Sequence, residues 1–196
     1  MSKTGIIILA AGGSTRMGEL KQLMMYKGRT LLQHIICEAK EASLEPVICV
    51  TGCQSGCVAE NISGMGVSVV YNGRWPEGMG SGISTGIKQL KFWDVDAVIV
   101  AVSDQPYVSS ALFQKMLDLK SKSEKGIVAC SYAGTLGTPV LFLKKYFNRL
   151  ESMDGNEGAK KIVKLNPDDV CPIEFENGSI DIDTKEDYEK LISQTK

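Results

Sequence analysis

The sequence has little of what several classes of protein require. Its 196 residues carry 22 basic and 23 acidic side chains, so there is no positive excess to hold a nucleic-acid backbone. The apolar run Ile6–Ala11 is too short to span a bilayer, and no cleavage pattern typical of a signal peptide follows it. We therefore expect a cytoplasmic protein that binds neither nucleic acid nor membrane.

Histidine is scarce, and the cysteines are not spaced like zinc ligands. His34 is the only histidine, and the six cysteines include no tight Cys-x-x-Cys pair. Cys49, Cys53 and Cys57 are evenly spaced, but Cys49 falls within a predicted strand. We expect the thiols to be reduced and partly buried, and His34 to be structural.

Short apolar runs alternate with amphipathic stretches along the first two thirds of the chain. The runs are nearly continuous and β-branched, which is typical of parallel strands covered on both faces. The predicted strands are 5–10, 46–51, 67–71, 97–102 and 126–131, and the predicted helices are 30–42, 81–90 and 109–119. This alternation predicts an α/β fold with a doubly wound, mostly parallel sheet between layers of helices.

The last third of the chain has a less regular pattern. We expect a loop and short strand over 134–143, helical material over 146–165 with a turn at 155–158, a strand over 169–175 and a closing helix over 188–192. No repeat or Pro/Gly/Ser-rich linker interrupts the sequence, so we expect a single domain over residues 1–196.

A glycine-rich loop directly follows the first predicted strand. Small residues there let a ligand approach the backbone, and consecutive N–H groups in such a loop can bind an anion. Arg16 and Lys21 add positive charge, so the segment is typical of a triphosphate cradle. Neither the P-loop nor the dinucleotide fingerprint is present, and an ordinary turn with solvated basic side chains is the alternative. The loop reads Leu9, Ala10, Ala11, Gly12, Gly13, Ser14, Thr15, Arg16, Met17 and Gly18.

Asp104 stands just past the buried strand predicted over 97–102. Ligands of open α/β sheets bind beyond the carboxyl ends of the strands, so Asp104 is expected to face the same crevice as the glycine-rich loop. A carboxylate there suits Mg²⁺, which prefers oxygen ligands. The alternative is a capping role for the helix that begins near Ser109, although Ser109 itself would cap it better.

Asp181 and Asp183 lie near the C-terminus in an alternating pattern with Ile180 and Ile182. The alternation places both carboxylates on one face, where one of them could join Asp104 at a metal ion. Alternatively, Asp183 or Thr184 caps the final helix.

Two further segments combine glycine with a proline or a helix start. The segment Gly78, Met79, Gly80 and Ser81 runs into a predicted helix and has more glycine than a cap at Ser81 needs, which favours ligand contact. The segment Gly137, Thr138 and Pro139 either lines an acceptor pocket or turns the chain into a core strand, and residue chemistry favours the turn.

In this order, the five segments resemble one family. The chain resembles the molybdopterin nucleotidyltransferases, MobA-like NTP transferases, and most closely their molybdenum cofactor cytidylyltransferase branch. The matching motifs are Leu9-Ala10-Ala11-Gly12-x-Ser14-x-Arg16-Met17-Gly18 with Lys21, Glu77-Gly78-Met79-Gly80-Ser81, Asp104-Gln105-Pro106, Gly137-x-Pro139-Val140-Leu141-Phe142 and Asp181-Ile182-Asp183-Thr184.

The resemblance implies a fold and a set of site residues. The fold is the Rossmann-like three-layer sandwich of nucleotide-diphospho-sugar transferases. The glycine-rich loop from Leu9 to Ser14 would hold the nucleotide, and the Gly78–Gly82 loop would approach the base. Arg16, Lys21 and Asp104 would be catalytic, with Mg²⁺ on Asp104 and Asp183.

The resemblance also implies a reaction, namely Mg²⁺-dependent transfer of CMP from CTP to the molybdenum–molybdopterin cofactor with release of pyrophosphate. A molybdenum enzyme would then receive the product. One position departs from the family, because Thr138 stands where a histidine is common, and this bears on the acceptor. The alternatives are a GTP-using guanylyltransferase, a cytidylyl- or uridylyltransferase for sugar or polyol phosphates, a glycosyltransferase, and a non-catalytic cofactor carrier.

Overall fold

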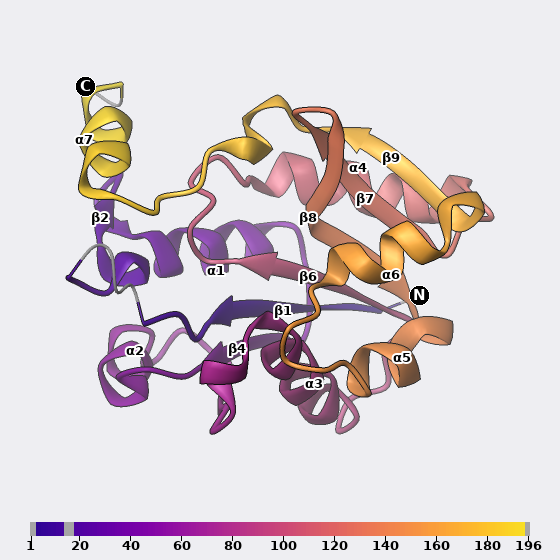
Figure 1. The fold of residues 1–196 in the computed structure, drawn as a ribbon, viewed down its shortest axis with the longest axis horizontal. Helices are drawn as coiled ribbons and strands as arrows, with labels where there is room; N and C mark the ends of the chain where they lie inside the picture. The colour runs from indigo at the N-terminus through magenta and orange to yellow at the C-terminus, as the bar shows by residue number, and fades with distance from the viewer. Residues whose placement is uncertain (1–2, 14–17, 195–196) are drawn as a thin grey trace.

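The structure, a computed structural model, describes residues 3–13 and 18–194 and is built on a seven-stranded sheet (Figure 1). The strand order is β5-β4-β1-β6-β8-β7-β9. The strands are β1 Thr4–Ala10, β4 Val47–Thr51, β5 Ser68–Tyr71, β6 Ala97–Val102, β7 Ile127–Tyr132, β8 Thr135–Leu143 and β9 Val170–Glu174. All neighbours pair in parallel except β8, which is antiparallel to both β6 and β7.

Helices cover both faces of this sheet and make the fold a three-layer sandwich (Figure 1). The α-helices are α1 Leu31–Glu41, α2 Ser55–Asn61, α3 Met79–Leu90, α4 Ser110–Lys122, α5 Phe147–Glu151, α6 Ala159–Leu165 and α7 Lys185–Ser193. Short 3₁₀ turns are η1 Lys21–Leu23, η2 Trp75–Glu77, η3 Lys144–Tyr146, η4 Pro167–Asp169 and η5 Glu176–Ser179, and β2 Met25–Tyr26 pairs with β3 Arg29–Thr30. The predicted α/β class and three-layer architecture are confirmed.

The centre of the sheet is apolar on both faces because the helices bury both. Ile6 and Ile8 of β1 pack with α1, α2 and α4, whereas Ile7 packs with α3, α5 and α6. All three side chains are fully buried. A strand covered on both faces has a continuous apolar sequence, and this continuous run was enough to locate β1 and β6 in the sequence.

The helix starts follow ordinary capping chemistry. The Thr30 hydroxyl accepts from the Gln33 backbone N–H to begin α1, and Ser109 caps α4 in the same way. Thr184 caps α7 in a capping box with Asp187. Asp104 and Asp183 are therefore not needed as caps.

Three predictions about local structure were wrong. The segment predicted as a loop and short strand over 134–143 forms the nine-residue strand β8 from Thr135 to Leu143, and Gly137–Pro139 lies inside it rather than at a turn. The pairing of β8 with β7 shifts register between Ala129 and Cys130, so this glycine-proline segment marks an irregularity within a strand. Helix α3 begins at Met79, two residues before the predicted start. The sequence pattern also did not predict α2 or the β2–β3 hairpin.

Within the described part of the chain, no helix combines the length and apolar character needed to cross a bilayer. His34 packs edge to face against Tyr26, with ring centroids 5.1 Å apart. Burial lowers the pKa of His34, so the ring is held neutral against an apolar neighbour. This arrangement agrees with a structural role.

Asp169 ties together three segments at the edge of the sheet. Its Oδ1 accepts from the Gly126 N–H at 2.9 Å, and its Oδ2 accepts from the Tyr146 hydroxyl at 2.5 Å and from Lys145 Nζ at 2.7 Å. Burial alone would raise the pKa of Asp169, but these donors outweigh it and hold the pKa at about 2.

We predict that Asp169→Asn lowers the free energy of unfolding at pH 7 by about 1 kcal/mol, a value reduced for partial solvent exposure. The wild-type carboxylate stabilises the fold above its unfolded-state pKa of about 4, and the effect disappears as the pH falls towards 2. Urea unfolding at pH 7 and pH 2.5 measures this. The control is Asp168→Asn at the exposed neighbouring position. If the difference in unfolding free energy between wild type and Asp169→Asn does not become smaller at pH 2.5, the Asp169 carboxylate does not stabilise the fold as proposed.

Candidate active site

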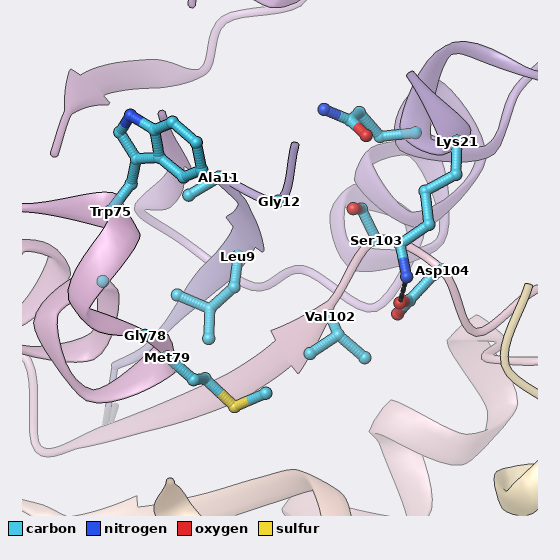
Figure 2. Close-up of a pocket in the computed structure, with 12 residues that line it drawn as sticks. Leu9, Ala11, Gly12, Lys21, Trp75, Gly78, Met79, Val102, Ser103 and Asp104 are labelled. Atoms are coloured by element: carbon cyan, nitrogen blue, oxygen red, sulfur yellow. Dashed lines mark hydrogen bonds and ion pairs between the residues drawn. The ribbon is translucent and has the colours of Figure 1, made fainter. Parts of the chain in front are cut away.

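A cavity of about 270 Å³ opens beyond the carboxyl ends of β1 and β6 (Figure 2). These two strands are paired in parallel with Leu9 opposite Val102, so the loops that follow them begin side by side. The lining residues are Leu9, Ala11, Gly12, Lys21, Gln22, Trp75, Gly78, Met79, Gly82, Val102, Ser103 and Asp104. The cavity therefore lies where ligands bind in open α/β sheets.

One part of the cavity is apolar. Figure 2 shows Leu9, Val102 and Met79 lying together near its floor, with the Trp75 indole beside Ala11. Gly82 of α3 also lines this part, and a Cβ placed there would lie 3.3 Å from Leu9 Cδ2. This wall suits a flat ligand group with apolar faces.

Trp75 is held against the glycine-rich loop by close backbone packing. A Cβ at Gly52 would lie 2.6 Å from both the Ala11 carbonyl oxygen and Trp75 Cβ, so only glycine fits there. The Cys53 N–H donates to the same Ala11 carbonyl at 3.3 Å. A Cβ at Gly13 would in turn lie 3.4 Å from the Trp75 ring. The loop and the indole therefore form one packed unit.

The opposite end of the cavity is charged. Lys21 Nζ lies 2.5 Å from Asp104 Oδ2 and 2.7 Å from Asp183 Oδ1, so one ammonium bridges two carboxylates (Figure 2 draws the bond to Asp104). The side chains of Lys21 and Asp104 are each 17% exposed, which strengthens their attraction relative to a surface pair.

Backbone contacts bring Asp183 to this point although it lies far from Asp104 in the sequence. The Ile182 N–H donates to the Asp104 carbonyl at 3.0 Å, and the Ile182 side chain is fully buried. Thr184 takes the helix cap, so the Asp183 carboxylate faces Lys21. Residues 180–183 are not a strand, yet Asp181 and Asp183 are exposed on either side of buried Ile182, as their alternation predicted.

The charges in this cluster perturb one another. Burial alone would lower the pKa of Lys21, but the Asp104 and Asp183 carboxylates outweigh it and raise the pKa above its ordinary value, so the amine stays protonated at neutral pH. Partial burial, together with the charges of Asp104 and Asp183, raises the pKa of Asp181 to about 6. Carboxylates that disfavour each other's ionisation in this way create a negative potential that attracts cations.

The donor set fits a magnesium ion. Asp104 Oδ1 is buried and makes no hydrogen bond within the described residues, so it has an open coordination position. Asp183 supplies a second carboxylate close by. Residues 3–13 and 18–194 contain no cluster of three His, Cys, Asp or Glu side chains for a metal, but Mg²⁺ is commonly held by one or two carboxylates, with phosphate oxygens and water completing its shell.

The structure brings seven of the sequence-predicted binding residues to the cavity wall: Leu9, Ala11, Gly12, Lys21, Gly78, Met79 and Asp104. Ala10, Gly13, Gly80 and Ser81 do not line it. The Ser81 hydroxyl is buried and bonds to Asn72 and to the carbonyls of Arg74 and Gly78. Gly80 packs against the backbone at Asp154. The small Gly80 and Ser81 therefore serve the packing of α3.

Two predicted residues, Ser14 and Arg16, lie outside the described residues. Sequence reasoning did not single out Gln22, Trp75, Val102 and Ser103 as cavity residues, whereas Gly82, which ends the segment expected to approach the base, does line the cavity. A tryptophan in a glycine-rich segment was a usable signal for Trp75, since large aromatic side chains are costly to leave in loops without a packing partner or ligand. Val102 and Ser103 follow from the position of β6 once the sheet order is known.

We predict that Gly52→Ala displaces Trp75 and lowers the thermal unfolding midpoint, because the added methyl group would overlap the Ala11 carbonyl. Trp75 and Trp93 are the only tryptophans, so a Trp93→Phe background isolates the fluorescence of Trp75. Gly56→Ala is the matched control, since no atom lies within 4 Å of a Cβ there. An unchanged Trp75 emission in the Gly52 variant would show that the contact does not hold the indole.

Comparison with known proteins agrees with this geometry. Residues 6–170 match the MobA-like NTP transferase domain. The purine catabolism protein PucB of Bacillus subtilis is 25% identical over 196 residues, covering 94% of each chain. The structure of Rv0371c from Mycobacterium tuberculosis is 25% identical with a TM-score of 0.82 over 98% of both chains. The fold also matches the Rv0371C complex with manganese, at 24% identity and a TM-score of 0.78 over 98% of both chains. The chain therefore belongs to the family of the MobA-like NTP transferase domain and is a nucleotidyltransferase.

Proposed function

We propose that this nucleotidyltransferase transfers CMP from CTP to the molybdenum–molybdopterin cofactor, using Mg²⁺ and releasing pyrophosphate. The observation that carries the proposal is the cavity with an apolar wall at one end and Lys21, Asp104 and Asp183 at the other. A nucleoside triphosphate has the same division, with a flat base at one end and charged phosphates at the other.

The proposed orientation follows from this match. The base lies in the part of the cavity lined by Trp75 and Met79, and the phosphates extend towards Lys21 and Asp104. Backbone N–H groups of the loop from Ala10 to Gly13 are suited to the phosphate oxygens. Arg16 and Ser14 complete the cradle in this proposal, in keeping with the family motif.

In the reaction, a phosphate oxygen of the acceptor attacks the α-phosphorus of CTP, and the bond from that phosphorus to the β-phosphate oxygen breaks. The acceptor phosphate is already ionised at neutral pH, so the reaction needs no general base. Asp104 and Asp183 hold the metal, and Lys21 stabilises the charge on the departing pyrophosphate. Bound Mg²⁺ supplies charge neutralisation at the phosphates.

The finer parts of the proposal have different support. The manganese complex of Rv0371C supports a divalent cation in a protein of this fold. CTP and molybdopterin are supported by the motif set of the cytidylyl branch, including Ala10-Ala11. In this reading, a molybdenum enzyme receives the product. Thr138 in β8 is the position at which a different phosphorylated acceptor would first be sought.

The test is pyrophosphate release with Mg²⁺, measured with CTP and with GTP, each with and without molybdenum–molybdopterin. Release with CTP only when the cofactor is present supports the proposal. Release with GTP instead would make the protein a guanylyltransferase. Triphosphate binding with no release under any of these conditions would contradict it, and sugar and polyol phosphates would then be tested as acceptors.

We predict that Asp104→Asn lowers kcat at least about 100-fold, because the neutral amide holds a divalent cation and its phosphates poorly. Steady-state pyrophosphate release at saturating Mg²⁺ measures this. The substitution keeps the shape of the side chain, so circular dichroism and the unfolding midpoint should report an intact fold. Undiminished turnover in a folded variant would remove Asp104 from the metal site.

We also predict that Trp75→Ala raises the KM for CTP by about tenfold, since stacking on an aromatic ring contributes on the order of 1–3 kcal/mol per base. Initial rates over a range of CTP concentrations measure this. Trp93→Ala is the matched control because Trp93 lies outside the cavity lining. Equal KM values for both variants would place the base elsewhere.

A further inference from the structure

The sequence predicted Lys21 as a ligand of the triphosphate, but in the structure its ammonium already has anionic partners. Its ammonium lies between the two carboxylates proposed to hold the metal, at 2.5 Å from Asp104 Oδ2 and 2.7 Å from Asp183 Oδ1. The pair with Asp104 is largely shielded, since each side chain is 17% exposed. The protein thus supplies its own cation to these carboxylates.

A magnesium ion and this ammonium compete for the same two carboxylates, because Nζ lies on Asp104 Oδ2 and Asp183 Oδ1 beside the open Asp104 Oδ1. Mg²⁺ needs ligand oxygens at about 2.0–2.1 Å, in a nearly ideal octahedron. With Nζ at hydrogen-bonding distance from both carboxylates, a metal on those oxygens would lie next to a like charge in a partly dry site. Conversely, without either cation the shielded Asp104 carboxylate would be poorly solvated, and the two carboxylates would repel each other.

Lys21 can leave the carboxylates without rearranging the backbone. It begins the short turn η1, and the next residue, Gln22, is anchored by a bond from its Nε2 to the Ala10 carbonyl at 3.3 Å. The lysine stem has four rotatable methylene groups, and both Lys21 and Asp104 line the same cavity. A triphosphate in that cavity therefore offers the ammonium a second anionic partner within reach.

We propose that Lys21 acts as an internal counter-ion that excludes the divalent cation until a triphosphate draws its ammonium away, so that the metal enters with the nucleotide. The inference rests on the proposed function in taking Asp104 and Asp183 as the metal carboxylates. Binding is then ordered: the nucleotide-free protein binds metal weakly, and the triphosphate both recruits Lys21 and opens the metal position. In the nucleotide-free protein Lys21 is a positioning residue that controls access of the metal to the carboxylates, and it becomes a phosphate ligand when the triphosphate binds.

The test is titration of Mn²⁺ into nucleotide-free protein, with free Mn²⁺ measured by electron paramagnetic resonance. Wild type should bind Mn²⁺ weakly, and Lys21→Met should bind it about tenfold more tightly or better because the competing charge is gone. Lys21→Arg keeps the charge and should bind as weakly as wild type. Circular dichroism establishes that each variant is folded.

Two controls locate the effect. Lys91 lies outside the cavity lining, and its ammonium is 2.7 Å from a Glu151 carboxylate oxygen. The variant Lys91→Met should therefore leave the Mn²⁺ affinity unchanged. The double variant Lys21→Met with Asp104→Asn should lose the affinity gained by Lys21→Met. If the double variant keeps that affinity, the metal is bound elsewhere and the proposal is wrong.

Equal Mn²⁺ affinities of wild type and Lys21→Met would also overturn the proposal. The measurement needs no turnover, so its failure is distinct from failure of the proposed reaction. Equal affinities would refute ordered metal entry even if the protein still releases pyrophosphate. Absence of pyrophosphate release with every triphosphate would refute the proposed reaction while leaving the Mn²⁺ comparison intact.

Discussion

The parallel pairing of β1 with β6 is the constraint on which the rest of the structure depends. Both strands are buried on both faces, which is possible only when helices cover each side of the sheet. Their register places Leu9 opposite Val102, and the Ser103 N–H extends the ladder by donating to the Leu9 carbonyl at 3.3 Å. The glycine-rich loop and Asp104 therefore emerge together, and the cavity forms between them.

The charged end of the cavity depends on a long-range contact rather than on the sheet alone. Lys21, Asp104 and Asp183 come from three separate segments of the chain, and the carboxylates meet because Ile182 is buried and bonds to the Asp104 backbone. Lys21 offsets charge that the fold has concentrated in a partly dry place. The ion pair with Lys21 therefore stabilises the ionised form of Asp104 in its shielded position.

Much of the fold was predictable because its signals are local. Continuous β-branched runs identify buried parallel strands, and Thr30, Ser109 and Thr184 begin helices by chemistry within a few residues. The full length and antiparallel direction of β8 were not predicted, since Gly137 and Pro139 resemble a turn unless the register shift opposite Ala129 is known. Likewise, the glycines of α3 resembled a ligand loop, whereas Gly80 is small because another backbone packs on it.

By itself, the sequence determined the α/β class, the order of most elements and the charged residues of the candidate site, because burial patterns and motif chemistry are local to neighbouring residues. Only the tertiary structure decided which of those residues meet. Trp75 reaches Ala11 because Gly52 leaves room, and Lys21 lies between Asp104 and Asp183 because distant loops converge. Such contacts depend on packing between segments far apart in the chain, and no local pattern encodes their distances.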